Sequence, residues 1–162
     1  MRTLGIDPGT ALMGFGLVEG PEPLRLIEYG CLTTPAEVPL PRRLLALYQG
    51  LDALIRRHRP DQVAIECLYF SKNTRTAMAV GQARGVALLS AAVYGLEVAE
   101  YSPQQVKQAV AGYGGATKEQ VQEMIRVLLC LPSVPNPDDA ADALAIAICH
   151  CHFARAIALG LV

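Results

Sequence analysis

The sequence predicts an α/β fold with a mixed sheet, in which antiparallel strands open the chain and later strands return parallel after helices. Two observations predict it. Residues 1–33 contain three short apolar runs joined by Gly- and Pro-containing turns, the pattern of an antiparallel meander. A helical pattern then precedes another apolar run at 62–66, and a right-handed crossover can place that run parallel to the first strand.

The first three strands are expected at residues 1–7, 12–19 and 24–33. Pro8-Gly9 ends the first strand, because proline fixes φ and glycine accepts a positive φ. Residues 20–23 form the turn between the second and third strands. Gly14 and Gly16 in the second strand indicate either a β-bulge or a close approach of another segment to its backbone.

A helix is predicted where apolar residues recur at helical spacing over 44–55, and it ends before Pro60. Residues 74–94 are expected to form a long helix of small and apolar residues. Its Gly81 and Gly85 leave a groove for a neighbouring backbone, which belongs either to the sheet or to a second subunit. The remaining elements are one strand and three helices, expected at 96–101, 103–112, 117–131 and 136–153.

Composition favours a globular protein that forms a single domain over residues 1–162. Apolar residues make up 52% of the chain and charged residues 18%. Uncharged apolar stretches such as 85–96 are shorter than the roughly 20 residues that a membrane span needs, so we expect no membrane partner. We also expect no signal peptide, since only four residues separate Arg2 from Asp7. Five cysteines, an odd number, favour reduced thiols in the cytoplasm.

The net charge of −1 speaks against a nucleic-acid-binding protein at first sight. The net charge is misleading, however, when acidic residues cluster around a metal ion and basic residues cluster elsewhere. The chain has only three lysines, and all of them fall in loops or early helix turns: Lys72, Lys107 and Lys118.

Carboxylates end two of the predicted parallel strands. Asp7 follows the first strand and Glu66 ends the strand at 62–66, so both side chains should leave the sheet at its C-terminal edge, where α/β proteins place their ligand sites. An aspartate before Pro-Gly also serves simply to start a turn, and that interpretation of Asp7 stays open on this segment alone.

The last helix adds acids at its first turns. Asp139 and Asp142 are three residues apart and Asp138 and Asp142 four apart, so each pair shares a face and repels. The helix dipole explains one or two acids here, but three are harder to explain. Asp142 also lies in the otherwise apolar run 140–149, where an acid without a partner is costly, so a bound cation would explain it.

Hard oxygen ligands without a soft partner favour Mg²⁺ or Mn²⁺. Two such ions, roughly 4 Å apart, activate a water and stabilise the leaving oxygen in phosphodiester hydrolysis. The candidate ligands are four carboxylates: Asp7, Glu66, Asp139 and Asp142. Without metal these crowded acids should hold on to a proton, so we expect activity to fall at low pH.

Two further segments contain residues typical of binding sites. Tyr69 and Phe70 precede Lys72 in a predicted loop, which favours stacking on bases and contact with phosphate, although either ring could instead pack as a lid on the core. Residues 149–152 read Cys-His-Cys-His. On a helix these side chains point about 100° apart and cannot converge on one zinc ion, so we interpret them as core cysteines and helix-end histidines.

Taken together, these motifs resemble the RuvC family of Holliday-junction resolvases over nearly the whole chain. The segments that carry the resemblance are Gly5-Ile6-Asp7-Pro8-Gly9-Thr10, Ile65-Glu66, Lys72-Asn73, Lys107, Lys118 and Asp139-Ala140-Ala141-Asp142-Ala143-Leu144-Ala145. The resemblance implies an RNase H-like fold with a mixed five-stranded sheet, acting as a homodimer on four-way DNA junctions. It implies paired symmetric nicks with 5′-phosphate and 3′-hydroxyl ends, and action alongside the RuvA and RuvB branch-migration complex.

The resemblance also implies roles for single residues. The four carboxylates would carry two Mg²⁺ ions per subunit, with Mn²⁺ as a possible substitute, and Lys107 and Lys118 would contact phosphate near the cleaved bond. The helix with Gly81 and Gly85 would help to form the dimer interface. Where the family commonly has a Phe wedge this chain has Tyr69 followed by Phe70, so either ring could stack on opened bases. The Asp-Ala-Ala-Asp register favours Asp139 over Asp138 as a ligand.

Three other functions share some of these sequence features. A YqgF-like nuclease of the same fold, acting on RNA, shares the Ile-Asp-Pro-Gly start but is disfavoured by Lys107, Lys118 and Asp-Ala-Ala-Asp. A non-catalytic junction-binding module would gain nothing from acids near phosphate. An actin-like or sugar-kinase ATPase half-domain opens with a similar strand but would need a second lobe, which this chain lacks.

Overall fold

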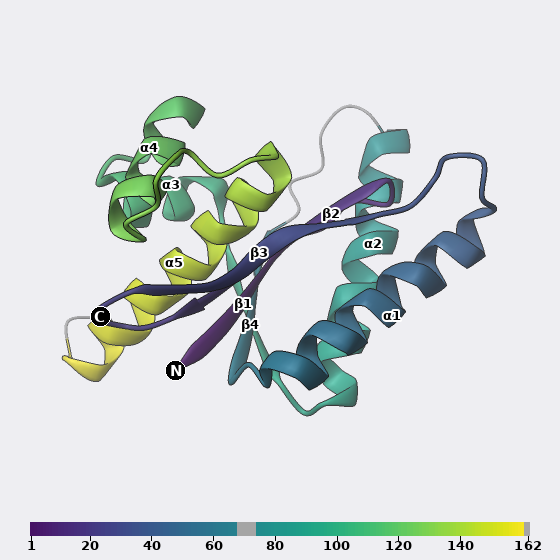
Figure 1. Ribbon diagram of the computed structural model, residues 1–162, viewed down its shortest axis with the longest axis horizontal. Coiled ribbons are helices and arrows are strands. Elements are labelled where there is room, and N and C mark those ends of the chain that lie inside the picture. Colours follow the sequence, from purple (N-terminus) through teal and green to yellow (C-terminus); the bar gives the residue numbers. More distant parts are fainter. Residues whose placement is uncertain (68–73, 161–162) are drawn as a thin grey trace.

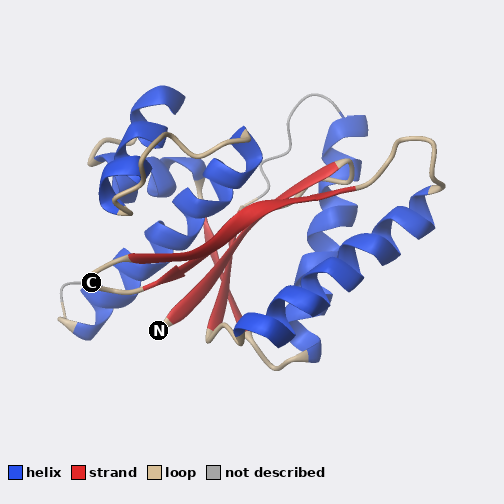
Figure 2. Ribbon diagram, in the orientation of Figure 1, coloured by secondary structure: helices blue, strands red, loops and turns tan. Residues whose placement is uncertain are grey.

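The computed structural model describes residues 1–67 and 74–160. One mixed sheet forms the middle layer, with α5, α3 and α4 on one face and α1 and α2 on the other (Figures 1 and 2). The five strands lie in the order β3-β2-β1-β4-β5. They are β1 (Arg2–Asp7), β2 (Leu12–Glu19), β3 (Arg25–Thr33), β4 (Gln62–Glu66) and β5 (Glu97–Tyr101).

The directions of the strands confirm the predicted mixed sheet. β1, β2 and β3 form the antiparallel meander, whereas β1 pairs with β4 and β4 with β5 in parallel. Ile6 lies opposite Ile65 in the parallel ladder, so the two residues that follow them leave the sheet at the same edge. The sheet therefore brings the ends of β1 and β4 together as the sequence predicted.

The helices lie where they were expected, with differences at their ends. They are α1 (Leu40–His58), α2 (Thr74–Val93), α3 (Pro103–Ala111), α4 (Lys118–Leu128) and α5 (Asp138–Ala158). α1 begins before the apolar pattern because Pro41 sits in its first turn, where proline is tolerated. α4 stops three residues short of the predicted Leu131, as Cys130 adopts a left-handed φ of 52°. α5 continues five residues beyond the predicted Phe153.

Glycines in β1 and β2 allow α5 to lie directly on the sheet. A Cβ at Gly5 would stand 2.2 Å from the carbonyl oxygen of Ala143, and a Cβ at Gly14 would stand 2.0 Å from that of Asp139. At Gly16 it would meet Leu144 at 2.8 Å. These distances decide between the two interpretations of the strand glycines: they permit a close approach, and the segment that approaches is α5.

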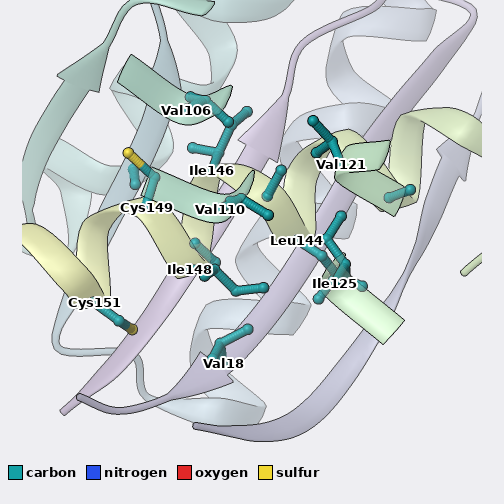
Figure 3. Packing of buried hydrophobic residues seen from close by; sticks show 14 of the residues in the cluster. Val18, Val106, Val110, Val121, Ile125, Leu144, Ile146, Ile148, Cys149 and Cys151 are labelled. Carbon is teal, nitrogen blue, oxygen red and sulfur yellow. The ribbon is translucent and has the colours of Figure 1, made fainter. Parts of the chain in front are cut away.

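The buried side of α5 forms the centre of one hydrophobic core. Figure 3 shows its Leu144, Ile146 and Ile148 among side chains of α3, α4 and β2. By length and composition α5 is also apolar enough to cross a membrane, but most of it is buried in this core, as in the core helix of a globular protein. A second core lies under α1 and α2 on the opposite face of the sheet.

Gly81 and Gly85 of α2 have no such close neighbour among the residues that the structure describes. No described atom beyond the helix's own backbone lies within 4 Å of a Cβ built at either position. The sheet is therefore not the partner of this groove. Of the two partners that the sequence left open, a second subunit remains, and it stays a prediction.

Candidate active site

Two strand ends supply the first pair of acids. Asp7 ends β1 and Glu66 ends β4, and Pro8-Gly9 turns the chain away directly after Asp7. Both side chains line one cavity of about 270 Å³ at the C-terminal edge of the sheet. Asp7 therefore does more than start a turn, because its carboxylate shares a cavity with a second acid.

The start of α5 supplies the second pair. Asp142 lines the same cavity as Asp7 and Glu66. Asp139 does not line it but lies over Gly14 of β2, and its charge acts on both Asp7 and Cys31 of β3. Three of the four predicted carboxylates thus share the cavity, and the fourth adjoins Asp7 on the side of β2.

Both predicted lysines of this region lie at the cavity as well. Lys107 comes from α3 and Lys118 from the first position of α4. The rest of the lining is Pro103, Val106, Val121, Ala145 and Ile146. The sequence analysis did not assign this apolar wall, although Val106 and Val121 lie on the buried faces of their helices and could have been found from that periodicity.

Burial and the charges of neighbouring acids raise the pKa values of the carboxyl groups at the cavity. Burial raises the pKa of Asp7 from 3.8 to about 7, with further contributions from the charges of Asp142, Asp139 and Glu66 in falling order. Burial also raises the pKa of Glu66; the charge of Asp142 adds to this, and the ammonium of Lys107 opposes it. The site therefore favours bound protons or another positive charge.

Lys118 supplies one such charge. Its Nζ lies 3.1 Å from Oδ2 of Asp142 and 3.2 Å from Oδ2 of Asp138. Burial raises the pKa of Asp142, and Lys118 partly offsets that rise. The sequence analysis explained Asp142 by a bound cation alone. The structure also gives it Lys118, a partner 24 residues away in the sequence that no local pattern indicates.

Asp138 takes part in the cluster from outside the cavity. Besides Lys118 it accepts a hydrogen bond from Nε2 of Gln122 at 3.0 Å, and these contacts lower its pKa. Its side chain is 64% exposed. Neither Asp138 nor Asp139 lines the cavity, so the choice of Asp139 over Asp138 as a ligand stays a prediction.

Hard carboxylate oxygens, forced together in a partly buried cavity, suit a divalent ion. Within residues 1–67 and 74–160, however, no three Asp, Glu, His or Cys side chains converge as ligands of a single ion. One visible reason is that the carboxylate of Asp142 is directed to Lys118. The donor set fits Mg²⁺ or Mn²⁺, provided that these side chains turn toward the ion.

In the Cys-His-Cys-His segment both cysteines are buried, as predicted, but His150 is buried too and does not lie at the helix end, because α5 continues to Ala158. The four side chains of the segment reach separate partners: Cys149 the carbonyl of Gln105, His150 the residues Tyr101 and Gln62, Cys151 the hydroxyl of Thr3, and His152 the carbonyl of Ala109. All five cysteines of the chain are free thiols. Tyr69, Phe70 and Lys72, the predicted DNA-contacting residues, lie outside the described residues.

Comparison with known proteins places this site in a family. The family described as "Crossover junction endodeoxyribonuclease RuvC" matches residues 3–150. A protein of that name from Chloroflexus aurantiacus is 64% identical over 155 residues, covering 95% of this chain and 94% of the relative. Another from Thermomicrobium roseum is 54% identical over 159 residues and covers 98% of each. The chain belongs to the RuvC family.

Solved structures support the same family assignment. "T. thermophilus RuvC in complex with Holliday junction substrate" superposes with a TM-score of 0.92 at 37% identity, over 99% of this chain and 97% of that one. The yeast mitochondrial Holliday junction resolvase Ydc2 superposes with a TM-score of 0.72 over 99% of this chain and 83% of that one, at 16% identity, and shows the fold alone. The RuvC neighbours confirm the RNase H-like fold that the resemblance implied.

Proposed function

We propose that this chain is a structure-selective endonuclease that resolves Holliday junctions in homologous recombination and DNA repair, with residues 1–162 acting as one nuclease domain. The observation that carries the proposal is the single cavity shared by Asp7, Glu66, Asp142, Lys107 and Lys118. The cavity thus combines carboxylates that can bind metal with lysines that can bind phosphate, as metal-dependent hydrolysis of a phosphodiester requires. Membership of the RuvC family supports the choice of substrate.

We propose two Mg²⁺ ions per subunit, with Mn²⁺ as a substitute, held by Asp7, Glu66, Asp139 and Asp142. When bound, such ions activate a water and stabilise the leaving oxygen. The raised pKa of Asp7 supports the assignment, since a cation would offset both the burial and the charge repulsion that raise it. Turning of Asp142 from Lys118 toward the ion would release the lysine.

Lys107 and the released Lys118 would then hold the phosphate backbone. Both lie at the cavity wall opposite the strand ends, on α3 and α4. Phosphate oxygens accept hydrogen bonds from an ammonium and gain its charge. Tyr69 and Phe70 as stacking residues and Lys72 as a backbone contact belong to the same proposal, which rests on the motif around them.

Lys118→Ala is expected to slow junction cleavage about tenfold or more, because it removes a charge that acts on the reacting phosphate. Single-turnover cleavage with saturating enzyme would measure the rate. Arg126→Ala is the matched control: this arginine lies on the same helix but pairs with Glu123 on the surface. An unchanged rate in Lys118→Ala would remove Lys118 from the site.

We propose that the protein acts as a homodimer, whose two-fold axis matches the pseudo-symmetry of a junction. The face of α2 supports this. Met78, Leu89 and Val93 are 65%, 57% and 56% exposed, and they share one side of the helix with Gly85. An apolar stripe beside a glycine without neighbours fits a second copy of the same helix.

Leu89→Glu is expected to convert the dimer into a monomer, since it places a charge in the middle of this stripe. Size-exclusion chromatography with light scattering would measure the molar mass. Val127→Glu changes an equally exposed apolar residue on α4, across the sheet, and should leave the dimer intact. A dimer that survives Leu89→Glu would move the interface away from α2.

The experiment that tests the activity uses a synthetic four-way junction with a short homologous core. Paired symmetric nicks with Mg²⁺, none with EDTA, and none on a linear duplex of the same sequence are expected. Tight junction binding without cleavage under any metal would point to a non-catalytic binding module, and cleavage of RNA without junction preference to a YqgF-like role. Action in the cytoplasm with the RuvA and RuvB complex completes the proposal and rests on the family.

A further inference from the structure

A largely buried chain of hydrogen bonds links β5, α5 and β4. The Tyr101 hydroxyl lies 2.7 Å from Nδ1 of His150, and Nε2 of His150 lies 2.5 Å from Oε1 of Gln62. An amide oxygen only accepts, so Nε2 carries the imidazole proton and Nδ1 accepts from the tyrosine. Burial lowers the pKa of His150, which agrees with this neutral form.

The tyrosine end of this chain is attached to one wall of the active site. Tyr101 lies opposite Glu66 in the parallel ladder, and its carbonyl accepts a hydrogen bond from the amide of Cys67 at 2.8 Å. The next residue, Ser102, caps α3 by accepting from the amide of Gln105. Any shift of Tyr101 therefore moves both Glu66 and the helix that carries Lys107.

The histidine end is attached to the other wall. His150 lies on α5 about two helical turns after Asp142, which faces the same cavity as Glu66. Tyr101 also packs on α5 through Phe153, at a centroid distance of 5.1 Å. The bond between Tyr101 and His150 is thus a direct polar link between the Glu66 side and the Asp142 side of the cavity.

We propose that Tyr101 and His150 are positioning residues of the carboxylate site, whose hydrogen bond sets the separation between Glu66 and Asp142. Apolar contacts alone tolerate small slips of one element along another. A directional bond does not, because a slip leaves two buried polar groups without partners. His150 is 6% and Tyr101 8% exposed, so water does not replace the lost partner. The inference rests on the proposed metal site.

The test measures Mn²⁺ affinity of the full-length protein without DNA, by titration calorimetry. Tyr101→Phe keeps the ring and removes only the hydroxyl. It is expected to weaken Mn²⁺ binding about tenfold and to lower kcat, with the junction Kd unchanged. Tyr94→Phe is the matched control, since it removes only the hydroxyl of another partly buried tyrosine, which bonds Asp52 of α1 on the opposite face of the sheet. It should lower thermal stability but leave Mn²⁺ affinity within about twofold.

A second pair of variants tests the histidine. His150→Asn places an amide oxygen near the position of Nδ1, where it can accept from Tyr101, and should bind Mn²⁺ more tightly than His150→Leu. Unchanged affinity in Tyr101→Phe, or equal weakening in Tyr101→Phe and Tyr94→Phe, would overturn the inference while the metal site stands. Absence of Mn²⁺ binding in the wild-type protein would overturn both.

Discussion

Asp7→Asn is expected to abolish junction cleavage while junction binding persists. The amide is uncharged and a poor ligand for a hard cation, but it leaves the phosphate-contacting lysines in place. Cleavage assays with Mg²⁺ and gel-shift assays with EDTA would measure the two properties on one protein preparation. Glu97→Gln removes a carboxylate from the opposite end of the sheet and should cleave normally. Loss of junction binding in Asp7→Asn would count against a role limited to metal.

The same substitution should stabilise the metal-free protein at alkaline pH. The pKa of Asp7 is raised to about 7, so between about pH 4 and 7 the folded state binds more protons than the unfolded state. Stability is therefore lost as the pH rises through this window. Asp7→Asn avoids this loss. We therefore expect its free energy of unfolding to exceed that of the wild-type protein by about 2–4 kcal/mol at pH 8 in EDTA, and by less toward pH 5.

Thermal melts of the wild-type protein and of Asp7→Asn at pH 5 and pH 8 would show this difference in stability. With saturating Mg²⁺ at pH 8 the wild-type protein should instead be the more stable of the two. Because a protonated carboxyl does not bind a metal, the Mg²⁺ concentration needed for half-maximal cleavage should also rise as the pH falls below about 7. A pH-independent difference between the two proteins would show that burial and the neighbouring acids do not raise the pKa of Asp7.

Gly14→Ala is expected to cost at least about 3 kcal/mol of stability and to remove cleavage together with it. The added methyl group would stand 2.0 Å from the carbonyl oxygen of Asp139 and 2.4 Å from its carbon, and neither is a flexible side chain that can turn away. The first turn of α5 would have to lift off β2. That turn carries Asp139, and Asp142 follows one turn later.

Gly30→Ala gives the comparison within the same sheet. A Cβ there would meet only the ring of Phe15, at 3.2 Å, and a ring can shift by a few tenths of an ångström. We expect a smaller loss of stability, under about 1 kcal/mol, and retained cleavage. Chemical denaturation of both variants would measure the difference. Equal costs would mean that α5 does not depend on the close approach at Gly14.

The strand ends of the active site could be predicted from the sequence because their signals are local. An apolar run that ends in an acid before a turn describes Asp7, and a similar run after a helix describes Glu66. The rule that parallel strands share a C-terminal edge then brings them together. The start of α5 was predictable for the same reason, from acids at the first turn of an apolar helix.

The contacts between elements could not be predicted in this way. The pairing of Lys118 with Asp142 depends on how α4 crosses α5, and the hydrogen bond from Tyr101 to His150 depends on how α5 lies along β5. Glycines in β2 signalled that something approaches the strand, yet neither periodicity nor capping identifies α5 as that segment. Such docking is decided by shape across the whole domain rather than by neighbours in sequence.

The candidate active site draws on segments far apart in the sequence. Asp7 belongs to β1, whereas Asp139 and Asp142 belong to α5, which packs against glycines of β1 and β2. A ribosome-bound chain that has not yet released α5 holds only half of the carboxylates, and its glycine-lined sheet surface stays bare. We therefore expect nuclease activity only after α5 has docked, in the same event that completes the core.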